Sequence, residues 1–423
     1  MAPTVPWPVL ITRLSTWVLV GTGLLAATAS RWATGRVLRR PVRGSPARDV
    51  VPTLVRLGPT FVKGGQLLST RADLLSPASC ARLARLTDRM EPMPAEVVRR
   101  ALAAAYSDGR PWPFAEFDYT AVASGSIAGV YRARLRSGAV VAVKVRRPGL
   151  DRVMLADFRL LGLFARLGER MPGLRGLPAR RMIDQVGPAV LGQLDLVREA
   201  AMLERLRDNL GTKVRIPATV PAAAGEGVLV MEFLDGLERF GPGSFTREQR
   251  SAIVKQILHA VYQMLFVDGL VHCDMHPGNL YLRPTGEVVL LDAGFVVELT
   301  PTVRKLFALF FLNMALGRPD ECADIVLQSA SALPADADLS GFRRDLGRLI
   351  RENHGRRAGQ FRLGPFAARL FDLQRRSRIT ADPEFVFPLL SLLVLEGMIN
   401  DFDVDVDFQT ESIPTLFHAL RSY

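Results

Sequence analysis

The stretch of sequence that decides the fold runs His272-Cys273-Asp274-Met275-His276-Pro277-Gly278-Asn279 and is followed by Leu291-Asp292-Ala293-Gly294-Phe295. Asn279 comes five residues after Asp274, and Asp292 comes thirteen residues after Asn279. Phosphoryl transfer needs a carboxylate near the attacking hydroxyl or water, together with neutral and anionic oxygen ligands for Mg²⁺. Each of the three residues alone is typical of an ordinary turn or cap. Together they predict a site for a magnesium nucleotide.

The same arrangement of residues is typical of kinase active sites. The interval between Asp274 and Asn279 matches the Asp-x-x-x-x-Asn of kinase catalytic loops. Upstream, Val141-Ala142-Val143-Lys144 ends a predicted strand, where kinase folds place the lysine that holds the α- and β-phosphates. Its expected partner is Glu199, at the start of the predicted helix Glu199–Leu206. Lys144 and Glu199 are 55 positions apart, farther than in ordinary protein kinases, which predicts inserted helices.

The rest of the chain divides into a helical first part, a mixed middle and a helical end. Periodicity and turn signals predict helices at Phe61–Asp73 (behind Pro59) and Cys80–Met90. Ala121–Arg134, a Ser137-Gly138 turn and Val140–Val145 predict a β-hairpin led by a loop of small residues, and Val228–Phe233 predicts a buried strand. The C-terminal part is expected to contain a helix from a Thr246/Gln249 capping box to Val267, a hairpin of Tyr281–Arg283 with Glu287–Leu291, and helices over most of Pro301–Tyr423, with Phe385–Leu395 as core. This order predicts an α+β, protein-kinase-like two-lobed fold with an N-terminal helical extension and a mostly helical C-lobe. The expected parts are 1–45, 46–110, 111–240 and 241–423.

The composition is that of a folded, basic protein. The 423 residues are 48% hydrophobic and 23% charged, which excludes a wholly disordered chain. Lysine and arginine number 54 against 42 aspartates and glutamates, and the net charge of +12 favours anionic partners such as lipid headgroups or nucleotides. Because no nucleic-acid-binding motif occurs, we expect no nucleic-acid partner. Cys80, Cys273 and Cys322 are widely separated, which argues against disulfides and CxxC metal sites.

The N-terminal segment allows two interpretations. Leu14–Ser30 is uncharged and rich in apolar residues, and its 17 residues approach the length of about 20 that a spanning helix needs. Arginines follow it at positions 31, 36, 39, 40 and 43, as expected for the cytoplasmic side of a bacterial membrane helix. The segment is therefore either a membrane anchor or interfacial helix, or an ordinary packing helix.

The segment Phe61-Val62-Lys63-Gly64-Gly65-Gln66-Leu67-Leu68-Ser69-Thr70-Arg71 resembles the KxGQ signature of the UbiB/AarF/ADCK family of atypical kinases. The resemblance continues in order through the small-residue loop Ala123-Ser124-Gly125-Ser126, the VAVKV strand and the HxDxHPGN motif, and it covers about residues 50 to 420. Ordinary kinases lack the KxGQ segment, so the resemblance is specific. It implies a kinase-like fold with ATP and Mg²⁺ as cofactors.

The resemblance also implies roles for individual residues. Lys144 would contact phosphates and pair with Glu199, and Asp274 would be the catalytic-loop acid. Asn279 and Asp292 would hold the metal, with Asp195 as a further metal ligand. Further roles fall to Lys63 and Gln66, which would fold over the site as part of the catalytic set, and to Ala123, Ser124, Gly125, Ser126 and Glu232, which would bind the nucleotide. His276 is expected to brace the catalytic loop, and Cys273 to be a small buried side chain.

Several positions depart from the family pattern. Gln193 stands where the family has the glutamate of its ExD motif, and Met202 replaces the asparagine of EAxN. Gly125 stands in place of alanine and Gly129 in place of glutamine, and we expect glycine's wider range of backbone angles to bring the loop closer to phosphate. Ala293 replaces the phenylalanine of DFG and should disturb the metal little.

Three functions stay open from the sequence. The first is an ATPase or phosphotransferase that supports isoprenoid-quinone or prenyl-lipid metabolism on the cytoplasmic face of a bacterial membrane, with anionic lipids, prenyl-lipid or quinone precursors and biosynthetic proteins as partners. The second is a catalytically weak pseudokinase, suggested by Gln193 and Met202. The third is a small-molecule phosphotransferase of the antibiotic-kinase kind, against which the segment Lys63-Gly64-Gly65-Gln66 argues.

Overall fold

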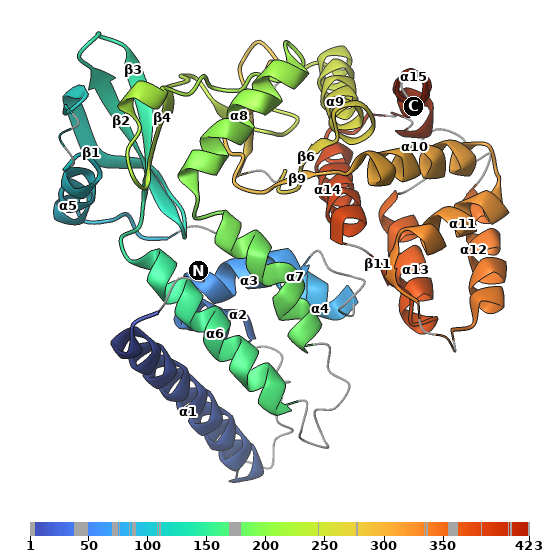
Figure 1. The fold of residues 1–423 in the computed structure, drawn as a ribbon, viewed down its shortest axis with the longest axis horizontal. Coiled ribbons are helices and arrows are strands. Elements are labelled where there is room, and N and C mark those ends of the chain that lie inside the picture. Colours follow the sequence, from blue (N-terminus) through green and yellow to red (C-terminus); the bar gives the residue numbers. More distant parts are fainter. Residues whose placement is uncertain are drawn as a thin grey trace. The chain divides into compact units, whose positions relative to one another are not determined.

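The computed structural model describes residues 5–37, 50–69, 75, 77–83, 85–86, 90–107, 109, 111–168, 179–243, 245–275, 278–333, 335, 337–353, 363–381, 383–404, 406 and 408–421. Figure 1 shows its helices and strands. The chain forms two compact units. The first comprises Met1–Leu196 and Ala223–Leu229, and the second comprises Val197–Ala222 and Val230–Tyr423. The four parts expected from the sequence stay a prediction.

Helices make up most of the first unit. In chain order they are α1 (Trp7–Val37), α2 (Val50–Leu57), α3 (Pro59–Ser69), α4 (Pro77–Leu83), α5 (Ala95–Ala105), α6 (Leu150–Gly168) and α7 (Ala179–Gly192). Pro59 is the first residue of α3, as predicted, because proline's missing amide costs nothing in a first turn. The predicted helix Cys80–Met90 is wrong in extent. Helix α4 ends at Leu83, and the Leu86 amide donates to the Leu83 carbonyl in a turn, 2.9 Å. Gly65 of α3 lies against the side chain of Leu86, so close that a Cβ would collide with it.

Helix α1 packs on α6 through a buried carboxylate. Asp157 of α6 is fully buried and accepts hydrogen bonds from Arg13 Nε at 2.7 Å, from Arg13 Nη2 at 2.9 Å and from Trp17 Nε1 at 3.1 Å. The Thr60 hydroxyl of α3 donates to the same carboxylate at 2.6 Å. These bonds join three helices, as the packing interpretation of the N-terminal segment expects. No helix of the described residues combines the length and apolarity needed to cross a bilayer.

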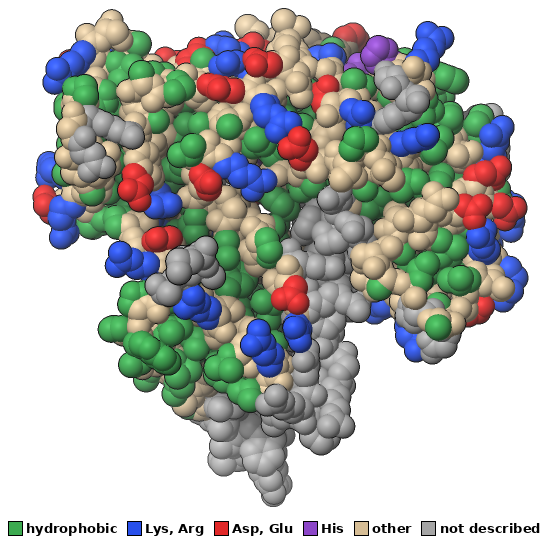
Figure 2. All heavy atoms as spheres, viewed as in Figure 1, with side chains coloured by type: hydrophobic (Ala, Val, Ile, Leu, Met, Phe, Trp, Pro, Cys, Tyr) green, Lys and Arg blue, Asp and Glu red, His purple; other side chains and the backbone are tan. Residues whose placement is uncertain are grey.

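One side of α1 nevertheless carries exposed apolar side chains. Trp7, Ile11, Leu14 and Val18 are exposed, and their spacing places them along one stripe of the helix. Exposed apolar side chains of α6, at Leu163, Phe164 and Leu167, add to the apolar surface. Figure 2 shows hydrophobic side chains gathered over this part of the first unit, with Lys and Arg side chains beside them.

A four-stranded sheet has the order β1-β2-β3-β4, with β1 (Phe114–Ser124), β2 (Ala128–Leu135), β3 (Val140–Arg146) and β4 (Val228–Glu232). The last three residues of β4 are counted with the second unit. The predicted hairpin of Ala121–Arg134 with Val140–Val145 is formed by β2 and β3, whereas Ala121–Ser124 belongs to β1, because the chain reverses at residues 125–127. Across β2 and β3, Val130 faces Lys144 and Tyr131 faces Val143. Successive side chains of a strand alternate between faces, so Lys144 and the fully buried Tyr131 lie on opposite faces. Strand β4 confirms the buried strand predicted at Val228–Phe233.

The second unit contains short sheets and most of the C-terminal helices. It comprises α8 (Leu196–Leu210, whose first residue belongs to the first unit), the 3₁₀ turn η2 (Pro221–Ala223), β5 (Glu238–Arg239), α9 (Arg247–Tyr262), the π-helix η3 (Gln263–Asp268), β6 (Leu270–His272), β7 (Leu280–Leu282), β8 (Val288–Leu290), β9 (Val296–Glu298), α10 (Pro301–Ala315), α11 (Pro319–Gln328), β10 (Ala330–Ala332), α12 (Leu339–Asn353), α13 (Leu363–Arg376), β11 (Thr380–Ala381), α14 (Pro383–Asn400) and α15 (Phe408–Leu420). Its sheets have the orders β5-β7-β8, β6-β9 and β10-β11.

Several predicted elements of this unit are confirmed. The Thr246 hydroxyl accepts from the Gln249 amide at 3.3 Å, and the Gln249 side chain accepts from the Thr246 amide at 2.9 Å, which completes the capping box of α9. The helix continues beyond Tyr262 as η3 rather than as regular α-helix. The predicted hairpin is formed by β7 and β8. In the core, Phe385 of α14 stacks on Phe307 with centroids 4.1 Å apart, and the described leucines 389, 392 and 395 of the apolar run are buried, as expected.

Candidate active site

A pair of short strands joins the segment that contains Asp274 to the segment that contains Asp292. Strand β6 leads into the catalytic loop, and β9 follows the Asp292 segment. The strands are antiparallel, with His272 opposite Val296, and the Cys273 amide donates to the Phe295 carbonyl at 2.9 Å. The pairing brings the residue before Asp274 next to the residues after Asp292. Residues that the sequence separates therefore meet at one place in the second unit.

His272 is the residue that ties this site together, and sequence reasoning gave it no role. Its imidazole is fully buried. Nε2 lies 2.7 Å from the Asp292 carbonyl and donates to it, while Nδ1 accepts from the Asp274 amide at 3.2 Å. One neutral ring thus bridges the main chain at both aspartates, which fixes its tautomer. Its place at the start of the motif was the available signal.

Asn279 extends this chain of hydrogen bonds. Its side-chain nitrogen donates to the Asp274 carbonyl at 2.8 Å, and its main-chain carbonyl accepts from the Leu291 amide at 3.1 Å. Since the nitrogen faces Asp274, the side-chain oxygen is the atom suited to hold a metal. The bond to Leu291 also anchors the residue that precedes Asp292. Asp274, Asn279 and Asp292 are therefore brought together, as the spacing suggested.

Asp292 begins a turn that orients its carboxylate. Oδ1 accepts from the Gly294 amide at 2.8 Å. Ala293 lies between Asp292 and Gly294 and is buried. Its small side chain fits this turn and does not need to contact the carboxylate. In the described residues, no group of three or more His, Cys, Asp and Glu side chains could hold a metal ion. Asn279 and Asp292 still fit Mg²⁺, because this ion takes few protein ligands and completes its shell with phosphate and water oxygens.

Cys273 lies beside Asp274, but its thiol is unsuited to nucleophilic chemistry. Burial raises the pKa of the Cys273 thiol far above its ordinary value, and the neighbouring Asp274 carboxylate raises this pKa further. A thiol held neutral is a poor nucleophile. The accessible surface of Cys273 shows only partial burial, so the expected small buried side chain is borne out only in part. His276, expected to brace the loop, lies outside the described residues.

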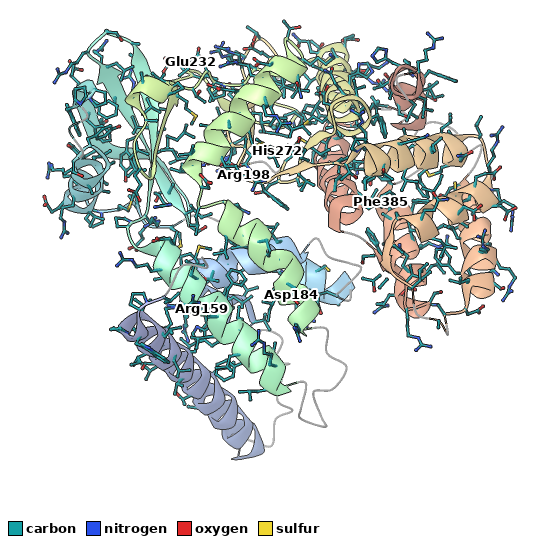
Figure 3. All side chains as sticks on the ribbon, viewed as in Figure 1. Arg159, Asp184, Arg198, Glu232, His272 and Phe385 are labelled. Carbon is teal, nitrogen blue, oxygen red and sulfur yellow. The ribbon has the colours of Figure 1, made fainter. Side chains whose placement is uncertain are left out.

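Helix α8 is tied to the same site within the second unit. Arg198 Nη2 donates to the Val296 carbonyl at 3.3 Å, and Arg205 makes two bonds to the Glu298 carboxylate at 2.9 and 3.0 Å. Figure 3 labels Arg198 on α8 and His272 at the end of β6. Both arginines contact β9, the strand that pairs with β6. Sequence reasoning did not single out these arginines, because an exposed helix arginine has no distinctive pattern.

Glu199 of α8 is almost fully buried. Met202, one turn further along the helix, is only partly buried. Asp195 is exposed and precedes the first residue of α8, so it does not share the helix with these two. Gln193, two positions before Asp195 in the sequence, is buried. Lys144 belongs to the first unit and Glu199 to the second, and their pairing stays a prediction.

Three further predicted site residues are Glu232 in the second unit and Lys63 and Gln66 in the first unit. The Glu232 carboxylate, labelled in Figure 3, accepts from Arg215 at 2.5 Å and from the Ala218 amide at 3.3 Å. Lys63 on α3 is buried, and the Gln66 side chain donates to the Leu86 carbonyl at 3.4 Å. Their contribution to a nucleotide site stays a prediction.

The predicted phosphate loop joins β1 to β2 in the first unit. Ala123 and Ser124 end β1, and the Gly125 amide donates to the Ala128 carbonyl at 2.9 Å, while Ser126 is fully buried. The described glycines with a positive φ do not include Gly125, and the expected closer approach of this loop to phosphate stays a prediction.

Gly129 leaves room for the side chain of Tyr131 on the same strand. A Cβ at this position would lie 2.8 Å from the Tyr131 hydroxyl. The larger side chain that the family pattern has at this position would meet that hydroxyl directly. The departure at Gly129 therefore accompanies a tyrosine on the buried face of β2.

Comparisons with known proteins agree with this geometry. The model of the ABC1 atypical kinase-like domain matches residues 85–325. A protein of Pseudomonas paraeruginosa named probable protein kinase UbiB is 29% identical over 429 residues, covering 99% of this chain and 77% of that protein. The uncharacterized protein slr0889 of Synechocystis is 28% identical over 340 residues, covering 77% of this chain and 82% of that protein.

Among solved structures, the Mycobacterium tuberculosis protein Rv3197 in complex with erythromycin has a TM-score of 0.54 and 20% identity, with 92% of this chain and 96% of that chain covered. This similarity supports the fold alone. The expected α+β, kinase-like fold is confirmed. The match over more than half of the sequence, together with the Asp274, Asn279 and Asp292 arrangement, shows that the chain belongs to the ABC1 atypical kinase-like family, whose relatives include the UbiB proteins.

Proposed function

We propose that this protein binds ATP with Mg²⁺ and either hydrolyses it or transfers its γ-phosphoryl group to a small molecule. The observation that carries the proposal is the hydrogen-bonded chain through Asn279, Asp274, His272 and Asp292. It holds a carboxylate, an amide oxygen and a second carboxylate on one rigid loop system. Preorganised groups of this kind are what phosphoryl transfer requires, since its catalysis is mainly positioning and charge stabilisation.

Each side chain has a defined part in this proposal. Asp274 accepts the proton of the attacking water or hydroxyl, and Asn279 and Asp292 hold the metal through their side-chain oxygens. Lys144 orients the α- and β-phosphates. When bound, Mg²⁺ neutralises charge that develops on the phosphate oxygens. Since His272 positions the main chain at both aspartates, the carboxylates need no rearrangement before the reaction.

The test is ATP turnover by the purified full chain with Mg²⁺, compared with EDTA. Asp292→Asn and Lys144→Ala should each abolish turnover. Nucleotide affinity is measured in parallel with a fluorescent ADP analogue. Failure of the unmodified protein to bind or hydrolyse any purine nucleotide, with or without lipid, would overturn the proposal.

We further propose that the protein works at a membrane surface rich in anionic lipid, on a prenyl-lipid or quinone precursor. The net charge of +12 and the exposed apolar stripe of α1 support this part. The resemblance to the UbiB/AarF/ADCK family supports the choice of a prenyl-lipid or quinone precursor. Flotation with phosphatidylglycerol vesicles should carry the protein upward, and neutral phosphatidylcholine vesicles should carry less. Replacing Ile11 and Val18 by serine should reduce flotation, and equal flotation of all samples would contradict the membrane part.

A second candidate is a nucleotide-binding module with little turnover. Gln193 supports it, because a buried neutral amide stands where the family pattern has a carboxylate. Losing an anionic oxygen near the metal weakens support for Mg²⁺. Tight Mg²⁺-dependent binding without turnover would favour this candidate. Restoration of turnover by Gln193→Glu would assign the loss to that position.

A further inference from the structure

Arg147 makes a dense set of contacts with the predicted phosphate loop. It follows directly after β3, and its guanidinium is partly buried. Nε donates to the Gly125 carbonyl at 3.0 Å, and Nη2 donates to the Ser124 hydroxyl at 2.9 Å. The main-chain amide of Arg147 donates to the Ile127 carbonyl at 2.9 Å. One residue therefore holds both sides of the reversal between β1 and β2.

The same guanidinium reaches the segment between α4 and α5. Nη2 of Arg147 donates to the Glu91 carbonyl at 2.7 Å. The Ser124 hydroxyl also donates to this carbonyl at 3.3 Å, and the Met90 amide donates to the Ser124 carbonyl at 3.2 Å. The phosphate loop is thus fastened to the helical extension that carries the KxGQ segment. All of these contacts lie within the first unit.

The geometry of an arginine side chain explains why position 147 can bond to several acceptors at once. Its planar guanidinium presents several donors in a fixed geometry, whereas lysine presents a compact charge on a flexible stem. The acceptors here are two main-chain carbonyls and one hydroxyl, which come from two separate segments of the chain. A lysine could satisfy part of this set but could not hold the loop and the Glu91 carbonyl in the same geometry.

We propose that Arg147 is a positioning residue that holds the Ser124–Ile127 loop in the conformation that receives nucleotide phosphates, and that it couples this loop to the Met90–Glu91 segment. The inference rests on the proposed nucleotide-binding function. Arg147 acts on binding rather than on chemistry, because its side chain bonds to the loop that is expected to receive the phosphates. Without it, the loop samples other conformations, and each nucleotide that binds must first order the loop.

The test compares Arg147→Lys, Ser124→Ala and the double variant with a matched control, Arg134→Lys. Arg134 is an arginine of the neighbouring strand β2 with an exposed contact to Glu116 at 3.4 Å. We expect Arg147→Lys to weaken Mg²⁺-dependent binding of a fluorescent ADP analogue about 10-fold, which equals about 1.4 kcal/mol. The KM for ATP should rise similarly, with kcat changed less than about 3-fold. Arg134→Lys should change neither.

The double variant separates positioning from general stability. Because Arg147 and Ser124 share one contact network, their effects on affinity should be less than additive. Ser124→Ala alone, which keeps the arginine, remains informative if Arg147→Lys fails to fold, and a loss of about 3-fold is expected from the hydroxyl it removes. Thermal midpoints of the nucleotide-free variants should stay close to that of Arg134→Lys.

The outcomes are distinct. If the unmodified protein binds no nucleotide, the proposed function fails and takes this inference with it. If the unmodified protein binds and Arg147→Lys binds equally well, the inference alone is overturned. A fall in kcat without a change in KM, or additive effects of the two substitutions, also overturns it. Weaker binding with preserved kcat and an unchanged thermal midpoint supports it.

Discussion

The catalytic loop of the second unit and the Asp157 network of the first unit are both built around aspartates, but they are held in opposite ways. At the loop, the main-chain amide of Asp274 donates to His272 and its main-chain carbonyl accepts from Asn279. At α6, the Asp157 carboxylate itself accepts from Arg13, Trp17 and Thr60. One region positions a carboxylate by fixing the backbone beneath it. In the other region, a carboxylate itself links three helices through the hydrogen bonds that it accepts.

This difference predicts which substitutions change the activity of the protein and which change its stability. Where main-chain bonds hold a residue in its loop, its carboxylate can be replaced by an amide while those bonds remain. A buried carboxylate with several donors cannot, because its removal leaves a buried guanidinium without its counter-charge. Substitutions in the two regions should therefore affect different measurements.

The largest expected effect is on activity at the catalytic loop. Asp274→Asn should lower kcat by about 10² to 10⁴-fold, as is typical when a positioned acid or base is lost. The thermal midpoint should hardly move, because the amide and carbonyl of residue 274 still bond to His272 and Asn279. Steady-state kinetics and thermal unfolding of the same preparation check both parts. Asp184→Asn, an exposed position on α7, is the control. A large loss of stability in Asp274→Asn would break the comparison.

The opposite result is expected in the first unit. Asp157→Ala should lower the free energy of unfolding by about 3–5 kcal/mol, since it breaks a buried ion pair by removing one partner. Urea unfolding measures this change. At a temperature where the variant is still folded, kcat should stay within a few-fold of the original. Asp184→Ala removes an exposed pair with Arg180 and should cost less than about 1 kcal/mol. Equal unfolding free energies of the two variants would mean that the buried network contributes no more to stability than an exposed ion pair.

His272→Phe sharpens the comparison, because this side chain belongs to the catalytic loop but is buried like Asp157. The ring volume is kept, while the donor to the Asp292 carbonyl and the acceptor for the Asp274 amide are both lost. We expect unfolding free energy to fall by about 1–3 kcal/mol, the usual cost of an unpaired buried polar group. Turnover should fall about 10-fold through misplaced carboxylates. Activity without any loss, measured on folded protein, would show that His272 does not position the loop.

The smallest effect is expected at the link between α8 and β9. The hydrogen bond from Arg205 lowers the pKa of the Glu298 carboxyl, and the positive charge of Arg205 adds to this. A carboxyl whose folded pKa lies below its unfolded value contributes stability above the unfolded value, and this contribution is lost as pH falls through the folded pKa. Glu298→Gln should therefore cost less than about 1 kcal/mol near neutral pH.

The pH dependence provides the check on this last pair. The difference in stability between the original protein and Glu298→Gln should shrink below about pH 4.5, the region in which a free glutamate becomes protonated. Added salt should shrink it as well, because the pair is exposed. Unfolding titrations between pH 3 and 7 measure this dependence. A difference that grows toward low pH would contradict the assignment of the pair.

Much of the candidate site could be predicted from the sequence. The spacing of Asp274, Asn279 and Asp292 identified residues that the second unit does bring together. The capping box at Thr246 and the short hairpin around Gly286 were equally predictable, because both depend on contacts between near neighbours. Such local patterns specify backbone geometry directly.

The residues missed by sequence reasoning are those that act through distant partners. Arg13 and Asp157 are 144 positions apart, and Arg205 and Glu298 are 93 apart. Nothing in the sequence around an arginine indicates which distant acceptor it meets. The boundary of the phosphate loop was also misplaced, since the small residues that suggested a loop partly belong to β1.

The sequence by itself determined the chemistry of this protein: which oxygen ligands and cations are present, in what order, and with what local turns and caps. Only the tertiary structure decided that His272 bridges two aspartates, that Arg147 fastens a loop to a helical extension and that Asp157 joins three helices. The physical reason is the range of the interactions. Short-range spacing is written along the chain, whereas the partner of a buried polar group is set by whichever surfaces pack together to exclude water.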